Sequence, residues 1–361
     1  MKLVTVVGAR PQFVKAAALS RALTAEAFSS ISHAIVHTGQ HYDENMSGSF
    51  FAELGIPSPV MNLAIGSGEH GAQTGAMMTG LEAAFDTLKP DMVLVYGDTN
   101  STLASALVAA KAGIPLAHVE AGLRSFRVAM PEEINRVVTD RLSQVLFCPT
   151  KLAMKNLEAE GKTDGVHLVG DVMFDIFSQQ LAQIDIGKTL ATFDFASDPF
   201  ALLTIHRQEN TDDQTRLRRL VAAFSQTAKS LPVIFPAHPR TLKSISDLGV
   251  DLGGIRILPP LPYGQMIALL GRASVVATDS GGLQKEAYFA QTPCVTLRDE
   301  TEWVETVEAG ANRLASPANK SAEAIVEIVL DASRSPMPAK AGALYGDGHA
   351  AEKIATVLAA L

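Results

Sequence analysis

Short apolar runs alternate with longer segments of helical periodicity along nearly the whole chain. The first series of runs is KLVTVVG, SHAIVHTG, DMVLVYG, IPLAHVEAG and QVLFCPT, with helix-like segments such as PQFVKAAALSRALTAE and STLASALVAAKAG between them. Apolar runs of this length, separated by helices, indicate parallel strands that are buried on both faces. The first half of the chain is therefore expected to form an α/β domain.

The pattern restarts near Gly170 and Asp171, where a second series begins with ALLTIH, VIFPAH, IRILP, SVVATDS and PCVTL. A chain of 361 residues usually spans more than one core. We therefore predict two Rossmann-like doubly wound domains, 1–170 and 171–348, that face each other across a cleft. The closing helix within 349–361 is apolar on one face and can cross back onto the first domain, which the sequence alone leaves open.

Composition narrows the class of protein. Hydrophobic residues make up 47% of the chain and charged residues 19%, which is typical of a globular protein with large buried sheets. The net charge of -8 argues against nucleic acid as the main partner, although a few local arginines still allow an anionic small molecule. The start of the chain does not resemble a signal peptide, and no apolar run suits a membrane span. We expect a cytoplasmic protein without a membrane partner, in which Cys148 and Cys294 are buried thiols.

A glycine turn after the run SVVAT is a candidate phosphate site. Ser280, Gly281 and Gly282 would open a helix there, and free backbone N–H groups at such a start attract anions. Glu286, one helical turn further on, is placed to accept hydrogen bonds from ribose hydroxyls. The alternative is an ordinary helix start in which Asp279 or Ser280 is the N-cap.

The first turn of the chain carries two basic candidates. Gly8-Ala9-Arg10-Pro11 follows the first run directly and does not match the dinucleotide-binding G-x-G-x-x-G, and the chain has no P-loop motif. Arg10 is placed to bind a diphosphate with its forked guanidinium. Lys15, one turn later, is a second candidate for binding the diphosphate, although the pattern favours a lysine on the surface of an amphipathic helix.

Three carboxylates follow successive strand-like runs. Asp98, Glu120 and Glu132 would converge on one cleft if those strands are neighbours, which suits acid–base chemistry. Asp98 is also a candidate N-cap for the next helix, and Glu132 can form an i, i+4 ion-pair ladder with Arg136 and Asp140. Glu120 has no such alternative, because a carboxylate in H-V-E-A-G is costly unless it is solvated or paired.

Two histidines follow strand-like runs of the second series. His206 lies in TIHRQEN and His238 in AHPRT, and each has an arginine nearby, Arg207 and Arg240. A single histidine is more often structural. Two at equivalent strand ends favour an anion or acid–base site, so His206 is a catalytic candidate and His238 a candidate for binding an anionic substrate.

The chain resembles the non-hydrolysing UDP-N-acetylglucosamine 2-epimerases. The resembling segments run in order from residue 8 to about residue 310. They are GARPQFVKAA, HTGQHYD, VYGDTNST, HVEAGLRS, MPEEINR, GDVMFD, TIHRQEN, HPRT and DSGGLQKEA. Each segment is weak alone, whereas the ordered set is highly specific.

The resemblance implies a GT-B-like fold, a homodimer, and an isomerase that needs neither NAD nor a metal. It implies that UDP leaves by anti elimination across C1 and C2, giving a bound 2-acetamidoglucal to which UDP adds back. The family's catalytic positions fall on Asp98, Glu120, Glu132 and His206. Its UDP-binding positions fall on Arg10, Ser280, Gly281, Gly282 and Glu286, and Arg136 matches the arginine of the motif P-E-E-x-N-R.

Two departures from the family pattern bear on substrate and regulation. Trp303 and Val304 replace the Arg-Pro of a common R-D-x-T-E-R-P-E segment. With this replacement the chain resembles the branch that includes UDP-2,3-diacetamido-2,3-dideoxyglucuronate 2-epimerases. UDP-2,3-diacetamido-2,3-dideoxyglucuronate is therefore an alternative substrate. Gln40 and His41 match part of the family's regulatory UDP-GlcNAc site, but the residues after them differ, so the resemblance does not extend to activation by substrate.

Three other functions remain open at this point. A GT-B glycosyltransferase would share the fold but needs an acceptor and has no use for bases on two ring faces. A hydrolysing epimerase often carries a kinase domain, which this chain lacks. An inactive nucleotide-sugar sensor would not need Asp98, Glu120, Glu132 and His206 together.

Overall fold

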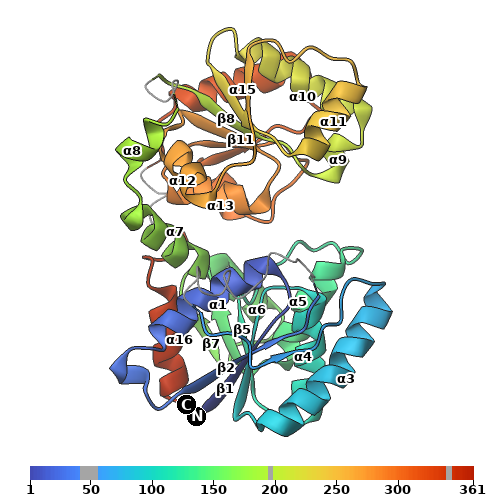
Figure 1. The fold of residues 1–361 in the computed structure, drawn as a ribbon, viewed down its shortest axis with the longest axis vertical. Coiled ribbons are helices and arrows are strands. Elements are labelled where there is room, and N and C mark those ends of the chain that lie inside the picture. The colour runs from blue at the N-terminus through green and yellow to red at the C-terminus, as the bar shows by residue number, and fades with distance from the viewer. Residues whose placement is uncertain (41–55, 194–197, 339–343) are drawn as a thin grey trace. The chain divides into compact units, whose positions relative to one another are not determined.

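The chain folds into two compact units, described here from a computed structural model over residues 1–40, 56–193, 198–338 and 344–361. Unit 1 comprises Met1–Ile176 and Tyr345–Leu361, and unit 2 comprises Phe177–Leu344 (Figure 1). Helix α7 (Val172–Gln183) contains the point at which the chain passes from unit 1 to unit 2.

Unit 1 is built on a seven-stranded parallel sheet with the order β3-β2-β1-β4-β5-β6-β7. Its strands are β1 (Lys2–Val7), β2 (Ser32–His37), β3 (Met61–Asn62), β4 (Met92–Tyr96), β5 (Leu116–Val119), β6 (Val145–Cys148) and β7 (Val166–Leu168). Successive residues of a strand face opposite sides of the sheet. Leu3 and Val7 of β1 accordingly belong to one hydrophobic cluster, and Val4 and Val6 belong to another.

Helices cover both faces of this sheet. The first cluster joins β1 to α1 and α16, whereas the second joins it to α3 and α4 (Figure 1). The helices of unit 1 are α1 (Arg10–Ala22), the 3-10 turn η1 (Glu26–Phe28), α3 (His70–Leu88), α4 (Asn100–Lys111), α5 (Pro131–Leu142), α6 (Lys151–Ala159) and α16 (Ala350–Ala359).

The C-terminal helix α16 packs against α1 and is fixed at its start by a buried carboxylate. Asp175 accepts hydrogen bonds from the backbone N–H groups of Ala350, at 2.9 Å, and Ala351, at 2.7 Å. These are two of the N–H groups that a helix start leaves without an intrahelical partner. Asp175 therefore anchors the returning end of the chain to unit 1.

Unit 2 repeats the architecture with a six-stranded parallel sheet of order β10-β9-β8-β11-β12-β13. The strands are β8 (Ala201–Thr204), β9 (Val233–Pro236), β10 (Ile255–Leu258), β11 (Val275–Thr278), β12 (Cys294–Thr296) and β13 (Asn312–Leu314). The helices are α8 (Ile186–Leu190), α9 (Gln208–Thr211), α10 (Gln214–Thr227), α11 (Pro239–Asp247), α12 (Tyr263–Arg272), α13 (Gly281–Phe289), α14 (Val304–Glu308) and α15 (Ala322–Arg334). Side chains of α10 and α15 pack with one face of the sheet into a single hydrophobic core.

Each sheet has its first strand in the middle, beside its fourth. In unit 1 this point lies between β1 and β4, and in unit 2 between β8 and β11. The strand order reverses there, so the loops diverge and ligands bind outside the carboxyl ends of these strands in doubly wound sheets. The predicted α/β class, with two Rossmann-like units of the GT-B-like kind, is confirmed. Among the helices that the structure describes, none is both long and apolar enough to span a bilayer.

Candidate active site

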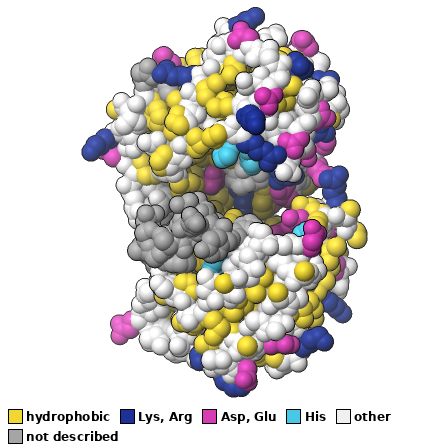
Figure 2. All heavy atoms as spheres, turned by 45° about the vertical axis from the view of Figure 1, so that its right-hand side comes forward, with side chains coloured by type: hydrophobic (Ala, Val, Ile, Leu, Met, Phe, Trp, Pro, Cys, Tyr) yellow, Lys and Arg dark blue, Asp and Glu magenta, His cyan; other side chains and the backbone are white. Residues whose placement is uncertain are grey.

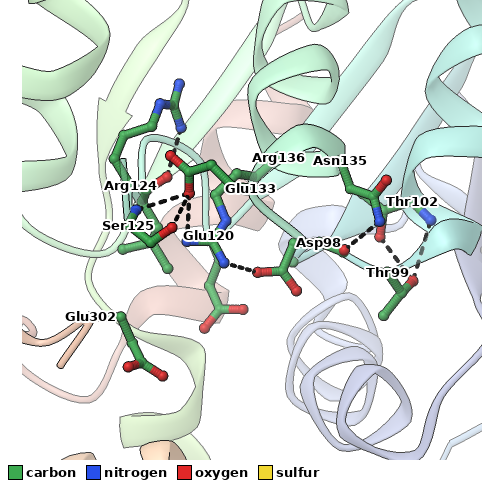
Figure 3. Close-up of polar contacts among 12 residues, drawn as sticks. Asp98, Thr99, Thr102, Glu120, Arg124, Ser125, Glu133, Asn135, Arg136 and Glu302 are labelled. Atoms are coloured by element: carbon green, nitrogen blue, oxygen red, sulfur yellow. Dashed lines mark hydrogen bonds and ion pairs between the residues drawn. The ribbon is translucent and has the colours of Figure 1, made fainter. Parts of the chain in front are cut away.

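Asp98 lies directly after β4, at the point where the strand order of unit 1 reverses. Its Oδ2 is 2.6 Å from a terminal guanidinium nitrogen of Arg136, which α5 supplies (Figure 3). The N-cap of α4 is Thr99, whose side chain accepts from the N–H of Thr102, so the capping alternative for Asp98 is wrong. The Asp98 carboxylate is therefore available to a ligand, with about a third of the side chain exposed (32%).

The pKa of Asp98 is raised above its ordinary value. Desolvation by the surrounding protein is the main cause, and the negative charges of Glu120 and Glu132 act in the same direction. Arg136 and Lys15 oppose the shift without cancelling it. Carboxyl groups with raised pKa values are typical of acid–base sites.

Glu120 lies in the turn after β5 and forms an ion pair with Lys15 of α1. Its side chain is only 8% exposed, and its backbone φ of 69° is in the left-handed region that most residues avoid. Such a backbone conformation persists only where its surroundings impose it. Lys15 is 13% exposed, so its assignment to the outer surface of the helix is wrong.

Glu132 and its neighbour Glu133 lie in different environments. Glu132 is exposed at the start of α5, whereas Glu133 is buried and accepts hydrogen bonds from the N–H groups of Ser125 and Phe126 and from the Ser125 hydroxyl. The expected i, i+4 ladder along α5 is wrong, because Arg136 pairs with Asp98. Glu132 lies close enough to Asp98 to influence its pKa.

A buried histidine–aspartate pair lies behind these carboxylates. Nδ1 of His118 is 2.7 Å from Oδ1 of Asp140, and Nε2 is 2.7 Å from the carbonyl oxygen of Gly97. Asp140 also accepts from Arg124 at 2.7 Å and from the N–H of Gly122 at 3.0 Å. Burial alone would raise the pKa of Asp140, but His118 and Arg124 outweigh it and lower that pKa. The network connects the turn before Asp98 to the turn after Glu120.

A second histidine–aspartate pair lies in unit 2, between the turns that follow β8 and β11. Nδ1 of His206 is 3.1 Å from Oδ1 of Asp279, and the His206 side chain is 53% exposed while Asp279 is fully buried. Asp279 is not the N-cap of α13. That cap is Ser280, whose hydroxyl accepts from the N–H of Leu283.

Gly281 and Gly282 open α13, where a ligand can approach the backbone. A Cβ on Gly281 would lie 2.6 Å from Oε1 of Glu302, whereas one on Gly282 would have nothing nearer than 4.0 Å. Glu302 is held by Arg298 at 2.8 Å. Burial alone would raise the pKa of Glu302, but the charge and hydrogen bond of Arg298, a backbone hydrogen bond and the charge of Arg207 together lower it. The helix start thus has its N–H groups next to the Glu302 carboxylate and to the guanidinium of Arg207, which lies 3.7 Å from the same Cβ position on Gly281.

Glu286 and His238 lie at further positions of unit 2. Glu286 accepts a hydrogen bond from the Tyr263 hydroxyl at 3.1 Å, and desolvation raises its pKa to about 7. His238 is exposed after β9, and its Nδ1 accepts from the N–H of Arg240 as the N-cap of α11.

The remaining predicted residues belong to the first turns of unit 1. The backbone of Arg10 begins α1, while its side chain falls outside the described part of the structure. Gln40 accepts hydrogen bonds from the N–H and the hydroxyl of Ser101, at 3.0 and 2.7 Å. His41, the other predicted regulatory residue, lies outside the described residues.

Sequence reasoning missed the residues that hold the site together. His118, Asp140, Arg124 and Glu133 were not singled out as contacts of the site, and Asp279 was considered only as a helix cap. Glu133 follows Glu132 directly, and only the phase of α5 decides which of the two is buried. His118 is a polar residue inside the apolar run PLAHV, two positions before Glu120. A polar side chain in a buried strand needs a partner, and that was the available signal.

The fold and the switch-point turns define an α/β enzyme with two Rossmann-like units. The profile of the UDP-N-acetylglucosamine 2-epimerase family matches residues 23–359. A UDP-2,3-diacetamido-2,3-dideoxy-D-glucuronate 2-epimerase of Pseudomonas aeruginosa is 47% identical, over all of both chains. A UDP-N-acetylglucosamine 2-epimerase of Methanocaldococcus jannaschii is 41% identical, over 99% of both chains.

Solved structures of UDP-GlcNAc 2-epimerases have the same fold as this chain. The Methanocaldococcus jannaschii enzyme in complex with UDP-GlcNAc and UDP superposes with a TM-score of 0.83 at 40% identity, covering all of both chains. The Neisseria meningitidis UDP-GlcNAc 2-epimerase bound to UDP-GlcNAc gives a TM-score of 0.86 at 28% identity, also over all of both chains. This chain therefore belongs to the UDP-N-acetylglucosamine 2-epimerase family, and it is an epimerase, an isomerase by reaction class.

Proposed function

We propose that this epimerase inverts carbon 2 of UDP-GlcNAc to give UDP-ManNAc. UDP departs by anti elimination across C1 and C2, and it returns to the resulting 2-acetamidoglucal after the C2 proton has been replaced from the other face. The observation that carries this proposal is the pair of carboxylates, Asp98 and Glu120, each held against a basic side chain at the carboxyl edge of one sheet.

The carboxylates supply the acid–base chemistry. The C2 proton is a weak acid, so its removal needs a positioned base, and inversion needs proton transfer on both faces of the ring. Asp98 is paired with Arg136 and has a raised pKa, so it holds a proton more readily than an ordinary aspartate, and Glu120 is paired with Lys15. Glu132, exposed and near Asp98, is the third acid–base candidate.

Unit 2 supplies the nucleotide contacts. The N-terminus of α13 with Ser280, Gly281 and Gly282 suits a diphosphate, and Glu286 suits the ribose hydroxyls. His206, Arg10 and Arg136 would stabilise the negative charge on departing UDP. We include Lys15 and His238 among the groups that serve the nucleotide sugar. No redox cofactor or metal takes part in this scheme.

A second substrate is favoured by a specific observation. The Pseudomonas aeruginosa relative, named for the diacetamido-dideoxyglucuronate, is more similar to this chain than the Methanocaldococcus jannaschii enzyme named for UDP-GlcNAc. Trp303, which departs from the family's common arginine, is buried and donates its indole N–H to the carbonyl oxygen of Gly281 at 2.9 Å. Epimerisation of UDP-2,3-diacetamido-2,3-dideoxyglucuronate by the same steps is therefore the second candidate.

Incubation with a single UDP-sugar and no acceptor tests the proposal. With UDP-GlcNAc we expect UDP-ManNAc and no free sugar, resolved by anion-exchange chromatography and identified by proton NMR. Free ManNAc in the mixture would indicate that the enzyme hydrolyses the UDP-sugar instead of epimerising it. Unchanged UDP-GlcNAc together with turnover of the diacetamido-uronate would select the second substrate, and no turnover of either would favour a transferase or a sensor.

We further propose that the enzyme is a cytoplasmic homodimer. Its two cysteines, Cys148 and Cys294, are buried thiols without a disulfide, as expected of a reducing compartment. Phe126 and Val128 are 76% and 79% exposed, and apolar side chains are spread over the visible surface of unit 1, the lower part of Figure 2. Light scattering should give twice the chain mass, and the mass of a single chain would contradict the dimer.

A further inference from the structure

Asp279 is a buried carboxylate that accepts several hydrogen bonds from the turn after β8. Its carboxylate accepts hydrogen bonds from the backbone N–H groups of His206, at 3.1 Å, and Arg207, at 3.0 Å. The side-chain amide of Asn210 donates to it at 3.1 Å. One side chain therefore fixes the backbone that leads to His206.

The same carboxylate contacts the imidazole itself. Nδ1 of His206 lies 3.1 Å from Oδ1 of Asp279. Hydrogen bonds from His206, Asn210 and Arg207 lower the pKa of Asp279 although burial opposes them, so the aspartate is ionised at neutral pH and can only accept. His206 must therefore carry a hydrogen on Nδ1.

The two ring nitrogens of a histidine point in different directions, so a bond at one determines what the other presents. With Nδ1 held by Asp279, Nε2 faces away from the pair, on a side chain that is 53% exposed. The pair also occupies the point where the strand order of unit 2 reverses. Thr204 and Thr278, the last residues of β8 and β11, are register partners with hydroxyl oxygens 2.6 Å apart. The turns that carry His206 and Asp279 thus start from rigidly joined strand ends.

We propose that Asp279 is a positioning residue for His206: it holds the hydrogen on Nδ1 and aims Nε2 at the diphosphate of the UDP-sugar. This inference rests on the proposed function, because that function gives His206 its task. Asp279 touches no substrate. Its contribution is to make the imidazole available in one tautomer and one orientation, which lowers the cost of organising the site during the reaction.

The Asp279→Asn variant keeps the shape of the side chain and can still accept from the backbone N–H groups. Its amide, however, offers a donor as well as an acceptor to the imidazole, so Nδ1 is no longer required to carry the hydrogen. We expect kcat to fall about 100-fold or more, with KM changed by less than about threefold, as expected for loss of the correct tautomer. Asp213→Asn is the matched control, because Asp213 is an exposed helix cap in the same unit. It should leave kcat unchanged.

A double-mutant cycle separates positioning from a general structural role. If Asp279 acts only through His206, the double variant Asp279→Asn/His206→Asn should be no slower than His206→Asn alone. Losses that multiply in the double variant would overturn the proposal. An Asp279→Asn enzyme that retains wild-type kcat would also overturn the proposal.

Nitrogen-15 NMR of histidine-labelled protein tests the tautomer in the wild type, whose Asp279 is intact. His206→Asn identifies the signal among the nine histidines. The proposal predicts a hydrogen-bearing Nδ1 in the free enzyme, and a neutral ring with its only hydrogen on Nε2 would refute it. This measurement needs no turnover, so failure of the proposed epimerisation appears separately, as wild-type protein that leaves both UDP-sugars unchanged.

Discussion

Each unit contains one histidine–aspartate pair at the carboxyl edge of its sheet, yet the two pairs leave their histidines in different situations. In unit 1, His118 is fully buried, and both of its ring nitrogens face acceptors, Asp140 and the carbonyl oxygen of Gly97. In unit 2, His206 uses one nitrogen on Asp279 and is 53% exposed. The same two residue types therefore form a closed pair in unit 1, where both ring nitrogens are used, and an open pair in unit 2, where one ring nitrogen is left for a ligand.

The difference indicates how to separate a structural histidine from a functional one. Both nitrogens of His118 face acceptors inside the protein, so neither is left for a ligand. Breaking such a buried contact leaves polar groups without partners, which is costly. His206 keeps one nitrogen for a ligand. Unit 1 thus presents carboxylates supported by a buried histidine–aspartate pair, and unit 2 presents the imidazole directly.

The largest effect is expected from the carboxylate that the unit 1 network supports. Glu120→Gln removes a base while keeping the side-chain shape, so kcat should fall about 1,000-fold or more. Binding of UDP, measured by calorimetry, should remain. Glu158→Gln, at an exposed position of α6, is the control. A Glu120→Gln enzyme with substantial turnover would show that the chemistry lies elsewhere.

Paired histidine variants test the comparison itself. His118→Gln removes a buried hydrogen-bond partner of Asp140 and of the Gly97 carbonyl oxygen, so the free energy of unfolding should fall by about 3 kcal/mol. His206→Gln should change it by less than about 1 kcal/mol, because the side chain is exposed and Asp279 keeps its backbone donors. Denaturant unfolding measures both variants. Equal losses would remove the distinction between the closed and the open pair.

The pH dependence of unit 2 should reflect Glu286. Because burial raises its pKa from 4.5 to about 7, the folded protein holds this proton more tightly than the unfolded chain. The resulting stabilisation is complete below pH 4.5 and is lost as the pH rises through about 7. Unfolding of wild type and Glu286→Gln at several pH values should show wild type losing less than about 3 kcal/mol relative to the variant across that interval. A constant difference would mean that Glu286 is not desolvated.

The smallest effect concerns the two glycines of α13. Gly281→Ala brings a Cβ against Glu302, which Arg298 holds in place, so it should destabilise unit 2 by about 1 kcal/mol. Gly282→Ala meets open space and should be neutral or slightly stabilising, since alanine favours helices more than glycine does. Thermal unfolding without ligand distinguishes them, and indistinguishable variants would contradict the close approach at Gly281.

The central strands of both sheets could be predicted from the sequence, because strands buried on two faces read as continuous apolar runs. Three of the four edge strands, β3, β7 and β13, could not, whereas the edge strand β10 matches the predicted run IRILP. β3 is only Met61–Asn62 and is partly exposed, and β7 and β13 have three residues each. Short strands with exposed positions lack the apolar run that marks the centre of a sheet.

The site could be predicted as far as position along the chain decides it. Asp98 and Glu120 follow predicted strands of unit 1 and His206 follows one of unit 2, and the parallel strands of each sheet bring such residues to its carboxyl edge. The ion pairs that these side chains form could not be predicted. Lys15 reaches Glu120 from 105 residues away, and Arg136 chooses Asp98 over its helical neighbour Glu132. These choices depend on helix phase and on which strands are adjacent in the sheet.

Incorporation of solvent hydrogen at C2 tests the central claim most directly. Wild-type enzyme is incubated in D₂O with the UDP-sugar that it turns over, and the product and the recovered substrate are examined by proton NMR. Removal and return of the C2 proton through carboxylates that exchange their protons with solvent predicts deuterium at C2 of the epimerised product. A product that keeps the original hydrogen at C2 would contradict the account.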